Sequence, residues 1–334
     1  MPLPPKLKVG DEIRVLALSR SLGGIMQFAG FTENDVEFAA GQLEALGLKV
    51  TFGRHVRECN AHLTASPEYR LADFHEAITN PSVKAILSVT GGMGAIQILE
   101  GIDYDQIKAH PKIICGYSDN AFFCNAILAR TGVATYYGPN FGTLMERRAG
   151  DYTARNFQAC LFSDAAMELC PAPQWSDDAW PKNQENRTFH DAEGFWAIQA
   201  GEAEGTVIGG SYYALNLLKG TDFFPPLREA VLFVENPASG KATLMDLDGG
   251  LRALTFLPEF ANVQGLVIGR FARSGGVTRE NLTALIGEIP ALRSLPVIAN
   301  VDFGHTTPMM TLPIGGRCRL MANNSKVGIT LTEH

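Results

Sequence analysis

The segment from Ile113 to Asn120, reading IICGYSDN, places a hydroxyl nucleophile where the local structure would expose it. Its first apolar residues predict the end of a buried strand, and the apolar run AFFCNAILAR after it predicts a helix. Ser118 is therefore expected on a sharp strand-to-helix turn, the geometry of a nucleophile elbow. The helix N-terminus adds free backbone N–H groups and the positive end of a dipole. The alternative is that Ser118 or Asp119 only caps the helix.

A serine nucleophile needs a base, and the base needs an acid that orients it. Of the seven histidines, His305 is the candidate base because it follows a predicted strand in the loop VDFGHTTP, although a loop histidine is also compatible with a surface role. Glu235 is the candidate acid because it ends the apolar strand VLFV, where a carboxylate can point into a cleft or into solvent. Asp302 and Asp248 are rival acids. The chain order Ser118, Glu235, His305 occurs in triads but is not diagnostic, because triads recur in unrelated orders.

A glycine-rich loop, TGGMG from Thr90 to Gly94, follows another predicted strand. A dinucleotide-binding loop would need a further glycine where this chain has Gln97, so that fingerprint fails. The loop can instead bring main-chain N–H groups close to a developing oxyanion. A tight turn without a chemical role is the remaining interpretation.

The elements that must position these residues alternate between strands and helices in the first half of the chain. The pattern predicts strands at Ile13–Leu18, Leu48–Phe52 and Ala85–Val89, and helices at Asn34–Leu46, after a glycine-containing loop, and Pro67–Ile78. Repeated βα units imply an open parallel sheet with helices on both faces. Ligands of such sheets bind at the carboxyl ends of the strands, which is where the glycine loop and Ser118 fall.

The composition changes between Phe162 and Glu204, a segment that carries all three tryptophans and lacks clear periodicity. We interpret it as a long loop or insertion, a class that is often functional in a compact protein. Short β-rich runs follow it, with helical segments near Ser211–Leu218 and Thr278–Ile286. We expect an N-terminal α/β domain at 1–165, a linker or insertion at 166–204, and a smaller β-rich domain at 205–334.

Bulk properties exclude several classes of function. The net charge is -7 and there is no basic run, which argues against a nucleic-acid partner. No apolar stretch approaches the roughly 20 residues of a membrane span, and the N-terminal residues lack the apolar core of a signal peptide. Cys59 and His62 have one metal-like spacing without a second pair, so we expect no metal site. The scattered cysteines are typical of reduced thiols in a cytoplasmic protein.

Several segments together resemble the LD-carboxypeptidase and microcin C immunity superfamily of serine peptidases. They are LKVGDEIRVLALS, TGGMGAIQIL, PKIICGYSDN, YYGP, GTVIGGSYYALNLLKGTDFFP, VLFVEN, VIGRF and NVDFGHTTPMMTLPIGG. The resemblance covers nearly the whole chain, in the same order and spacing. It implies an α/β fold with an open parallel N-terminal sheet of the flavodoxin or glutamine-amidotransferase kind, followed by a smaller β-rich domain.

The resemblance also implies roles for individual residues. The nucleophile of the family falls on Ser118, its glutamate on Glu235 and its histidine on His305. Its oxyanion hole, built from backbone groups, falls on Gly91 or Gly92 together with Asp119, the residue after the nucleophile. No metal or organic cofactor is implied.

The tryptophan-bearing segment resembles the microcin C immunity branch. Enzymes of this type hydrolyse the amide that joins a peptide or amino acid to a nucleotide-like group, and an aromatic side chain of the insertion stacks on the base, here Trp180 or Trp175. The chain departs from the pattern at Ser211, where many relatives have Asn, and at Asn236, where an acidic residue often follows the glutamate. Neither departure touches the triad.

We therefore expect a cytoplasmic serine hydrolase, forming a homodimer, that acts on a small peptide or aminoacyl-nucleotide substrate. Two alternatives remain open. The first is an LD-carboxypeptidase that trims murein tetrapeptides. The second is a non-catalytic binding protein with two α/β lobes that close on a small ligand, against which the lack of an export signal counts.

Overall fold

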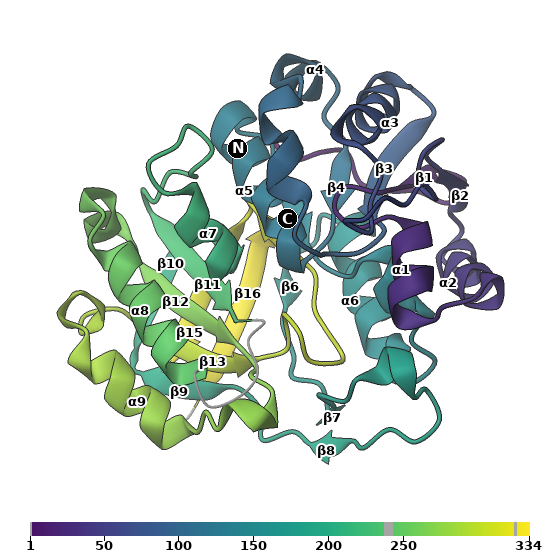
Figure 1. Ribbon diagram of the computed structural model, residues 1–334. Coiled ribbons are helices and arrows are strands. Elements are labelled where there is room, and N and C mark those ends of the chain that lie inside the picture. The colour runs from purple at the N-terminus through teal and green to yellow at the C-terminus, as the bar shows by residue number, and fades with distance from the viewer. Residues whose placement is uncertain (1, 237–242, 324–325) are drawn as a thin grey trace.

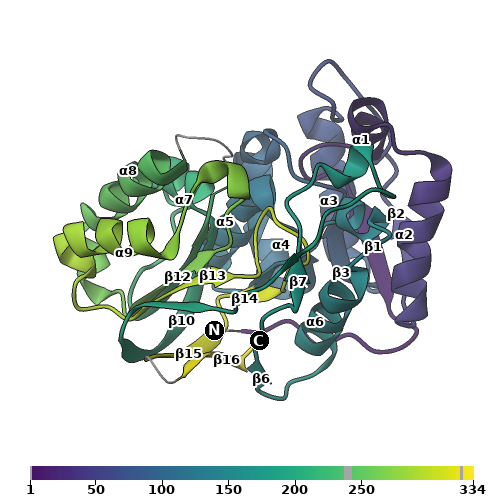
Figure 2. The ribbon, with the colours of Figure 1, turned by 90° about the horizontal axis from the view of Figure 1, so that it is seen from below.

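Two large β-sheets organise the chain, each in its own lobe (Figure 1; Figure 2). The computed structural model describes residues 2–236, 243–323 and 326–334. The lobe drawn in purple and blue contains the first half of the chain, and the lobe drawn in green and yellow contains most of the second half. This arrangement confirms the predicted α/β class with a parallel N-terminal sheet.

The first sheet lies in the lobe that carries Ser118. Within the described residues its strand order is β14-β5-β4-β3-β1-β2. All neighbours are parallel except β14, which pairs antiparallel with β5. Its strands are β1 (Glu12–Leu16), β2 (Lys49–Phe52), β3 (Val83–Ser88), β4 (Ile113–Cys115), β5 (Thr135–Tyr137) and β14 (Leu312–Ile314).

Helices cover this sheet and bury their apolar faces against it. They are α1 (Leu22–Ala29), α2 (Glu33–Ala45), α3 (Pro67–Thr79), α4 (Tyr104–Ala109), α5 (Ala121–Thr131) and α6 (Gly150–Phe162). Short 3-10 helices lie at η1 (Ala95–Gly101), η2 (Ser118–Asn120) and η3 (Phe141–Met145). The helices predicted at Asn34–Leu46 and Pro67–Ile78 correspond to α2 and α3.

One prediction for this region is wrong, because the supposed glycine loop contains helix α1. Ser21 caps that helix by accepting a hydrogen bond from the backbone of Gly24. A Cβ on Gly23 would lie 2.3 Å from the carbonyl oxygen of Arg57, and one on Gly24 would lie 2.1 Å from that of Leu63. These glycines are required because the helix packs directly against the backbone of a neighbouring loop, rather than because the chain turns.

The second sheet supplies the other side of the site. Its order among the described residues is β6-β16-β15-β10-β11-β12-β13-β9. Strands β10 to β13 are parallel and the flanking strands are antiparallel. The strands are β6 (Met167–Glu168), β9 (Trp196–Gln199), β10 (Gly201–Ser211), β11 (Ala230–Glu235), β12 (Gly265–Gly269), β13 (Val297–Val301), β15 (Arg317–Ala322) and β16 (Val327–Glu333).

Helices in this half connect the parallel strands. They are α7 (Tyr212–Leu218), α8 (Thr243–Thr255), α9 (Arg279–Glu288), η5 (Pro258–Asn262), η6 (Arg273–Gly275) and η7 (Pro290–Leu292). In the view of Figure 1, α7, α8 and α9 lie over one face of the sheet. The β-rich half is thus a mixed sheet with its own crossover helices.

The tryptophan-bearing segment is only partly the long loop that we predicted. It contains the small ribbon β7 (Gln174–Trp175) and β8 (His190–Asp191), and the 3-10 turn η4 (Trp180–Lys182). Its end, however, forms the edge strand β9, which pairs with β13. All of β9 is half-buried, so it lacks the alternation by which sequence patterns reveal a strand.

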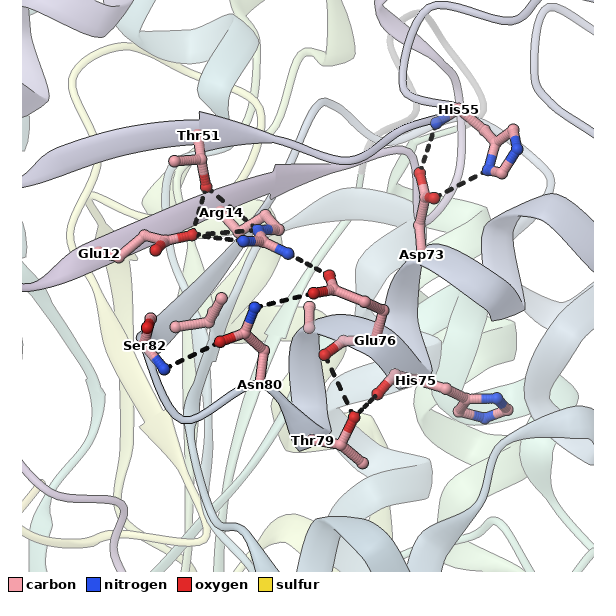
Figure 3. Close-up of polar contacts among 12 residues, drawn as sticks. Glu12, Arg14, Thr51, His55, Asp73, His75, Glu76, Thr79, Asn80 and Ser82 are labelled. Carbon is pink, nitrogen blue, oxygen red and sulfur yellow. Dashed lines mark hydrogen bonds and ion pairs between the residues drawn. The ribbon is translucent and has the colours of Figure 1, made fainter.

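Polar contacts tie the first two strands to helix α3 (Figure 3). Arg14 on β1 donates to Glu12 at 2.6 Å and forms an ion pair with Glu76 on α3. Thr51 on β2 donates to the same glutamate at 2.6 Å. Arg14, Glu12 and Thr51 are half-buried whereas Glu76 is exposed, and together these contacts link α3 to the two strands.

The two lobes share apolar packing. Helix α5 packs against β5 in the first sheet and β10 in the second, and Asn125 on α5 donates to the carbonyl of Gly209 at 2.9 Å. Phe123 and Phe233 belong to the same buried cluster. The strand β14 returns from the second half of the chain into the first sheet. The relative position of the lobes is therefore fixed by packed side chains and by the chain itself.

Among the described residues, no helix has the length and apolar character needed to cross a lipid bilayer. In the same part of the chain, no group of three or more His, Cys, Asp and Glu side chains is placed to hold a metal ion.

Candidate active site

Ser118 lies on the turn between β4 and α5 in a strained conformation. Its φ angle is 63°, in the left-handed region that non-glycine residues rarely adopt, and such strain collects at functional sites. The turn is tight because a Cβ on Gly116 would lie 2.8 Å from Oδ1 of Asn140. The backbone N–H of Ser118 donates to the hydroxyl of Tyr137 at 3.0 Å. The predicted strand-turn-helix geometry is therefore present.

A continuous chain of hydrogen bonds links Ser118, His305 and Glu235. The Nε2 atom of His305 lies 2.9 Å from Oγ of Ser118, and Nδ1 lies 2.7 Å from Oε2 of Glu235. Both distances are those of normal hydrogen bonds. With the ring proton on Nδ1, His305 donates to the carboxylate, and Nε2 is free to accept the serine proton.

Glu235 comes from the last position of β11 and is 1% exposed. Its side chain fits there because the two neighbouring segments have glycine at the points of contact. A Cβ on Gly304 would lie 2.7 Å from Oε2 of Glu235, and one on Gly269 would lie 2.8 Å from its Cβ. The glycine immediately before His305 thus lets the histidine loop close over the acid.

The two rival acids lie in other pairs. Asp302 forms a buried ion pair with Arg270 at 2.6 Å and accepts the N–H of Ala172 at 2.9 Å. Burial raises the pKa of Asp302, and the guanidinium of Arg270 opposes that rise. Asp248 pairs with Arg252 one turn along α8. Of the three acids considered from sequence, Glu235 is the one bonded to His305.

Tyr137 joins both ends of this arrangement and was missed by sequence reasoning. Its hydroxyl donates to Oε1 of Glu235 at 2.7 Å while it accepts the backbone N–H of Ser118. Burial, followed by the nearby charge of Glu235, raises the pKa of Tyr137 far above its ordinary value, so the hydroxyl keeps its proton. A Cβ on Gly210 would lie 2.6 Å from the ring, which explains the glycine at that position. The motif YYGP was visible, but nothing in it showed what the hydroxyl would meet.

The glycine loop lies directly against the nucleophile. A Cβ on Gly91 would lie 2.7 Å from Cβ of Ser118 and 3.3 Å from the backbone nitrogen of Asp119. The carboxylate of Asp119 accepts the N–H groups of Gly94 and Ala95, each at 2.8 Å. The side chain of Asp119 thus braces the loop, while its backbone nitrogen stays beside the serine.

The two tryptophans proposed as substrate contacts lie in different places. Trp180 packs on Phe31 with ring centroids 5.7 Å apart, and it lines a small cavity together with His305 and Tyr117. Trp175 instead lies under Arg270, whose guanidinium carbon is 4.9 Å from the centroid of the Trp175 ring. Trp175 lines a separate cavity. The structure brings Trp180, and not Trp175, beside the histidine.

A buried ion pair anchors the tryptophan-bearing segment near His305. Arg187 from that segment pairs with Glu146, which also accepts from the hydroxyl of Thr307 at 3.3 Å. Burial raises the pKa of Glu146 to about 7, against the opposing charge of Arg187. This cluster connects the turn bearing Trp180 to the loop bearing His305.

The two departures from the family pattern lie next to the acid. Ser211 pairs in register with Glu235 across β10 and β11. Asn236 follows Glu235 directly and donates to the carbonyl oxygen of Thr243 at 3.4 Å. Both side chains are buried.

The fold and this hydrogen-bonded chain are those of a serine hydrolase. Comparison with known families gives the particular group. The model of the LD-carboxypeptidase N-terminal domain matches residues 13–138, and that of the LD-carboxypeptidase C-terminal domain matches residues 204–320. The chain belongs to the LD-carboxypeptidase family of serine peptidases, peptidase family S66.

Individual relatives align over almost the full length. "Putative carboxypeptidase YocD" of Bacillus subtilis is 41% identical over 98% of this chain and 99% of its own. The crystal structure of an MccF-like protein from Bacillus anthracis is 40% identical and superimposes with a TM-score of 0.96 over 100% of both chains. The microcin C7 self-immunity protein MccF in complex with aspartyl sulfamoyl adenosine is 27% identical, with a TM-score of 0.87 over 100% of this chain and 99% of its own.

Proposed function

We propose that this peptidase hydrolyses the amide that joins an amino acid or short peptide to a nucleotide-like group. The observation that carries the proposal is the position of Trp180, which lines the same small cavity as His305. An indole at that position offers a stacking surface to a nucleobase within reach of the nucleophile. The MccF complex with aspartyl sulfamoyl adenosine supports this substrate class.

The proposed reaction uses Ser118, His305 and Glu235 as a catalytic triad. His305 takes the proton of Ser118 through Nε2 as Oγ attacks the amide carbonyl, and it then gives that proton to the leaving amine. A water molecule hydrolyses the acyl-enzyme in the reverse sequence. Glu235 holds the ring tautomer and stabilises the imidazolium, while the hydroxyl of Tyr137 donates a hydrogen bond to its buried carboxylate.

The negative oxygen of the tetrahedral intermediate needs backbone donors aimed at it. We assign this role to the N–H of Asp119 and to the N–H of Gly91 or Gly92. Support comes from the contact between Gly91 and Ser118, and from the two hydrogen bonds by which Asp119 holds the loop. Such fixed donors need no reorganisation during the reaction.

Trimming of a murein tetrapeptide is the second candidate, and the family description favours it. The same triad would serve, with D-alanine as the leaving amine. Purified enzyme should be given aspartyl sulfamoyl adenosine and a murein tetrapeptide in parallel. We expect a kcat/KM at least tenfold higher on the nucleotide-linked substrate. The opposite ranking would make the murein peptide the substrate class.

If the protein only binds a ligand and has no catalytic serine, it should not react with an activated phosphonate. We expect a fluorophosphonate probe to label the wild-type chain at Ser118 and to leave Ser118→Ala unlabelled. Equal labelling of both chains, or of neither, would contradict the serine mechanism.

Three further expectations remain proposals. The homodimer is tested by sedimentation and the cytoplasmic location by cell fractionation. The division of the chain at residues 165 and 204 is tested by limited proteolysis, which should cut first within 166–204.

A further inference from the structure

A second cavity opens beside the glycine loop, at the carboxyl end of β1. It encloses about 130 Å³, and its lining includes Ser19, Arg20, His62 and Thr64. The strand order β4-β3-β1 puts Ser118, the glycine loop and Arg20 at successive carboxyl ends of one sheet. Because neighbouring strands lie about 4.8 Å apart, Arg20 begins roughly 10 Å from the nucleophile. That distance is short enough for one small substrate to reach both.

The side chain of Arg20 is held in place from two sides. A Cβ on Gly92 would lie 2.8 Å from Cγ of Arg20 and 3.3 Å from its Nε. The guanidinium lies 4.6 Å from the ring centroid of Phe28. In the part of the chain that the structure describes, no Asp or Glu forms an ion pair with Arg20. Its charge is thus positioned without being neutralised.

The charges around the cavity favour an anion. Arg20 and His62 are its titratable lining residues, and both are basic. The nearest acid of the elbow, Asp119, is committed to the N–H groups of the glycine loop and to the hydroxyl of Ser19. The positive charge of Arg70 interacts with the negative charge of Asp119 and partly compensates it.

The outer wall of the cavity is built before any ligand arrives. Thr64 donates through its hydroxyl to the carbonyl of Ser19, and the N–H of Asn60 donates to the carbonyl of Thr64 at 2.9 Å. Leu63 has a φ angle of 59°, a strained value for a leucine. A loop fixed in this way lowers the entropy lost when a ligand binds.

Helix α1 and the chain just after it contact both Arg20 and Trp180. Phe28 on α1 lies against the guanidinium of Arg20, and Phe31, two residues beyond the end of α1, packs on Trp180. A leaving group that stacks on Trp180, as proposed above, would therefore lie on the side of the site that this segment borders, as Arg20 does.

We propose that Arg20 and the cavity beside it form a subsite for an oxyanion on the leaving-group side of the scissile amide. The inference rests on the proposed serine-peptidase function. The shared chemistry is a negatively charged oxygen group close to the leaving nitrogen. In a peptide it is the terminal carboxylate, and in an aminoacyl nucleotide it is the phosphoryl or sulfamoyl group. The guanidinium can bind a carboxylate, a phosphoryl group or a sulfamoyl group through charge-assisted, bidentate hydrogen bonds.

The test compares substrates with and without this charged group. One pair is a murein tetrapeptide and its C-terminal amide. The other is aspartyl sulfamoyl adenosine and an analogue in which aspartate is joined by an amide directly to 5′-amino-5′-deoxyadenosine. Arg20→Met should lose about 10- to 100-fold in kcat/KM on the charged member of the preferred pair, and less than threefold on its neutral member. Arg20→Lys should recover part of the loss.

Arg54→Met is the matched control, because Arg54 is exposed just beyond β2 at the same edge of the sheet. It should leave both members of each pair unchanged. The subsite would be overturned if Arg20→Met lost the same factor of kcat/KM on the charged and the neutral substrate. It would also be overturned if Arg54→Met lost as much kcat/KM as Arg20→Met.

Binding in the Ser118→Ala background separates this inference from the proposed function. In this background, AMP should bind at least tenfold more tightly than adenosine, and the tetrapeptide should bind more tightly than its amide. Both preferences should disappear when Arg20 is replaced by Met. If the wild type hydrolyses neither substrate but this preference holds, the proposed function fails and the subsite stands. If no preference for either anion depends on Arg20, the subsite is wrong.

Discussion

Removal of one hydroxyl, in Tyr137→Phe, should uncouple the nucleophile turn from the acid. The hydroxyl of Tyr137 makes two hydrogen bonds, one to the carboxylate of Glu235 at 2.7 Å and one from the N–H of Ser118 at 3.0 Å. The phenyl ring would still fill the space, since the ring is fully buried and packs against Gly210. The substitution therefore tests the hydrogen bonds rather than the packing.

The magnitude follows from the two contacts. A hydrogen bond to a charged group contributes about 1.5–3 kcal/mol and a neutral one about 0.5–1.5 kcal/mol. Losing both should lower the free energy of unfolding by roughly 2–4 kcal/mol, a large part of a typical total. If only the charged bond acts on catalysis, kcat should fall about 10- to 100-fold, since about 1.4 kcal/mol corresponds to a factor of ten.

Comparison of kcat with the free energy of unfolding separates positioning from simple loss of stability. Without the hydroxyl of Tyr137, the carboxylate of Glu235 loses a donor that fixes it beside His305. We therefore expect kcat to fall under conditions in which the variant is still fully folded. Urea unfolding and kcat should both be measured for Tyr137→Phe.

Tyr136→Phe is the control for these measurements. Tyr136 is the neighbouring residue on β5, is also buried, and its hydroxyl has no hydrogen-bond partner in the described structure. It should leave stability within about 1 kcal/mol and kcat unchanged. If both variants unfold alike and Tyr137→Phe keeps its kcat, the hydroxyl does not position Glu235.

The remaining predictions concern the triad and the aromatic wall. Ser118→Ala should lower kcat by about 10⁶ with an unchanged urea midpoint, and more than a few per cent residual activity would exclude the serine mechanism. His305→Ala should lose more activity than Glu235→Gln, and the double variant should be little worse than His305→Ala, since a triad acts as a unit; additive kinetic losses would contradict this. Trp180→Ala should cost roughly 1–3 kcal/mol of transition-state binding on nucleotide-linked substrates and spare substrates without a base. Trp175→Ala is its control, and equal kinetic effects of both changes on both substrates would indicate a structural role.

The nucleophile turn could be predicted because its signal is local. An apolar strand end, a glycine and a serine before an apolar helix follow one another within IICGYSDN, and the structure has that strand, turn and helix. The left-handed φ of Ser118 could not be read from the sequence, because it depends on the contact with Tyr137 and on the packing of Gly116.

The choice of acid could not be made from residue types. Glu235, Asp302 and Asp248 all end or follow apolar segments, so local patterns treat them alike. The structure separates them by their cationic partners, since Asp302 pairs with Arg270 and Asp248 with Arg252. The strand-end position of Glu235 made it the candidate and the family resemblance favoured it. Neither could exclude the two aspartates, because the partner of His305 depends on contacts between distant segments.

The path of the chain around His305 argues against a site that forms by closure of two lobes. The loop that bears His305 begins at β13, in the second sheet, and ends at β14, which is hydrogen-bonded into the first sheet beside β5. Tyr137 on β5 holds Glu235 of the second sheet directly. A hinge motion that separated the lobes would have to break the β14 pairing and this buried hydrogen bond together. His305 and Glu235 are therefore held against Ser118 before substrate arrives. Catalysis by fixed groups requires such an arrangement, and a binding protein with closing lobes does not.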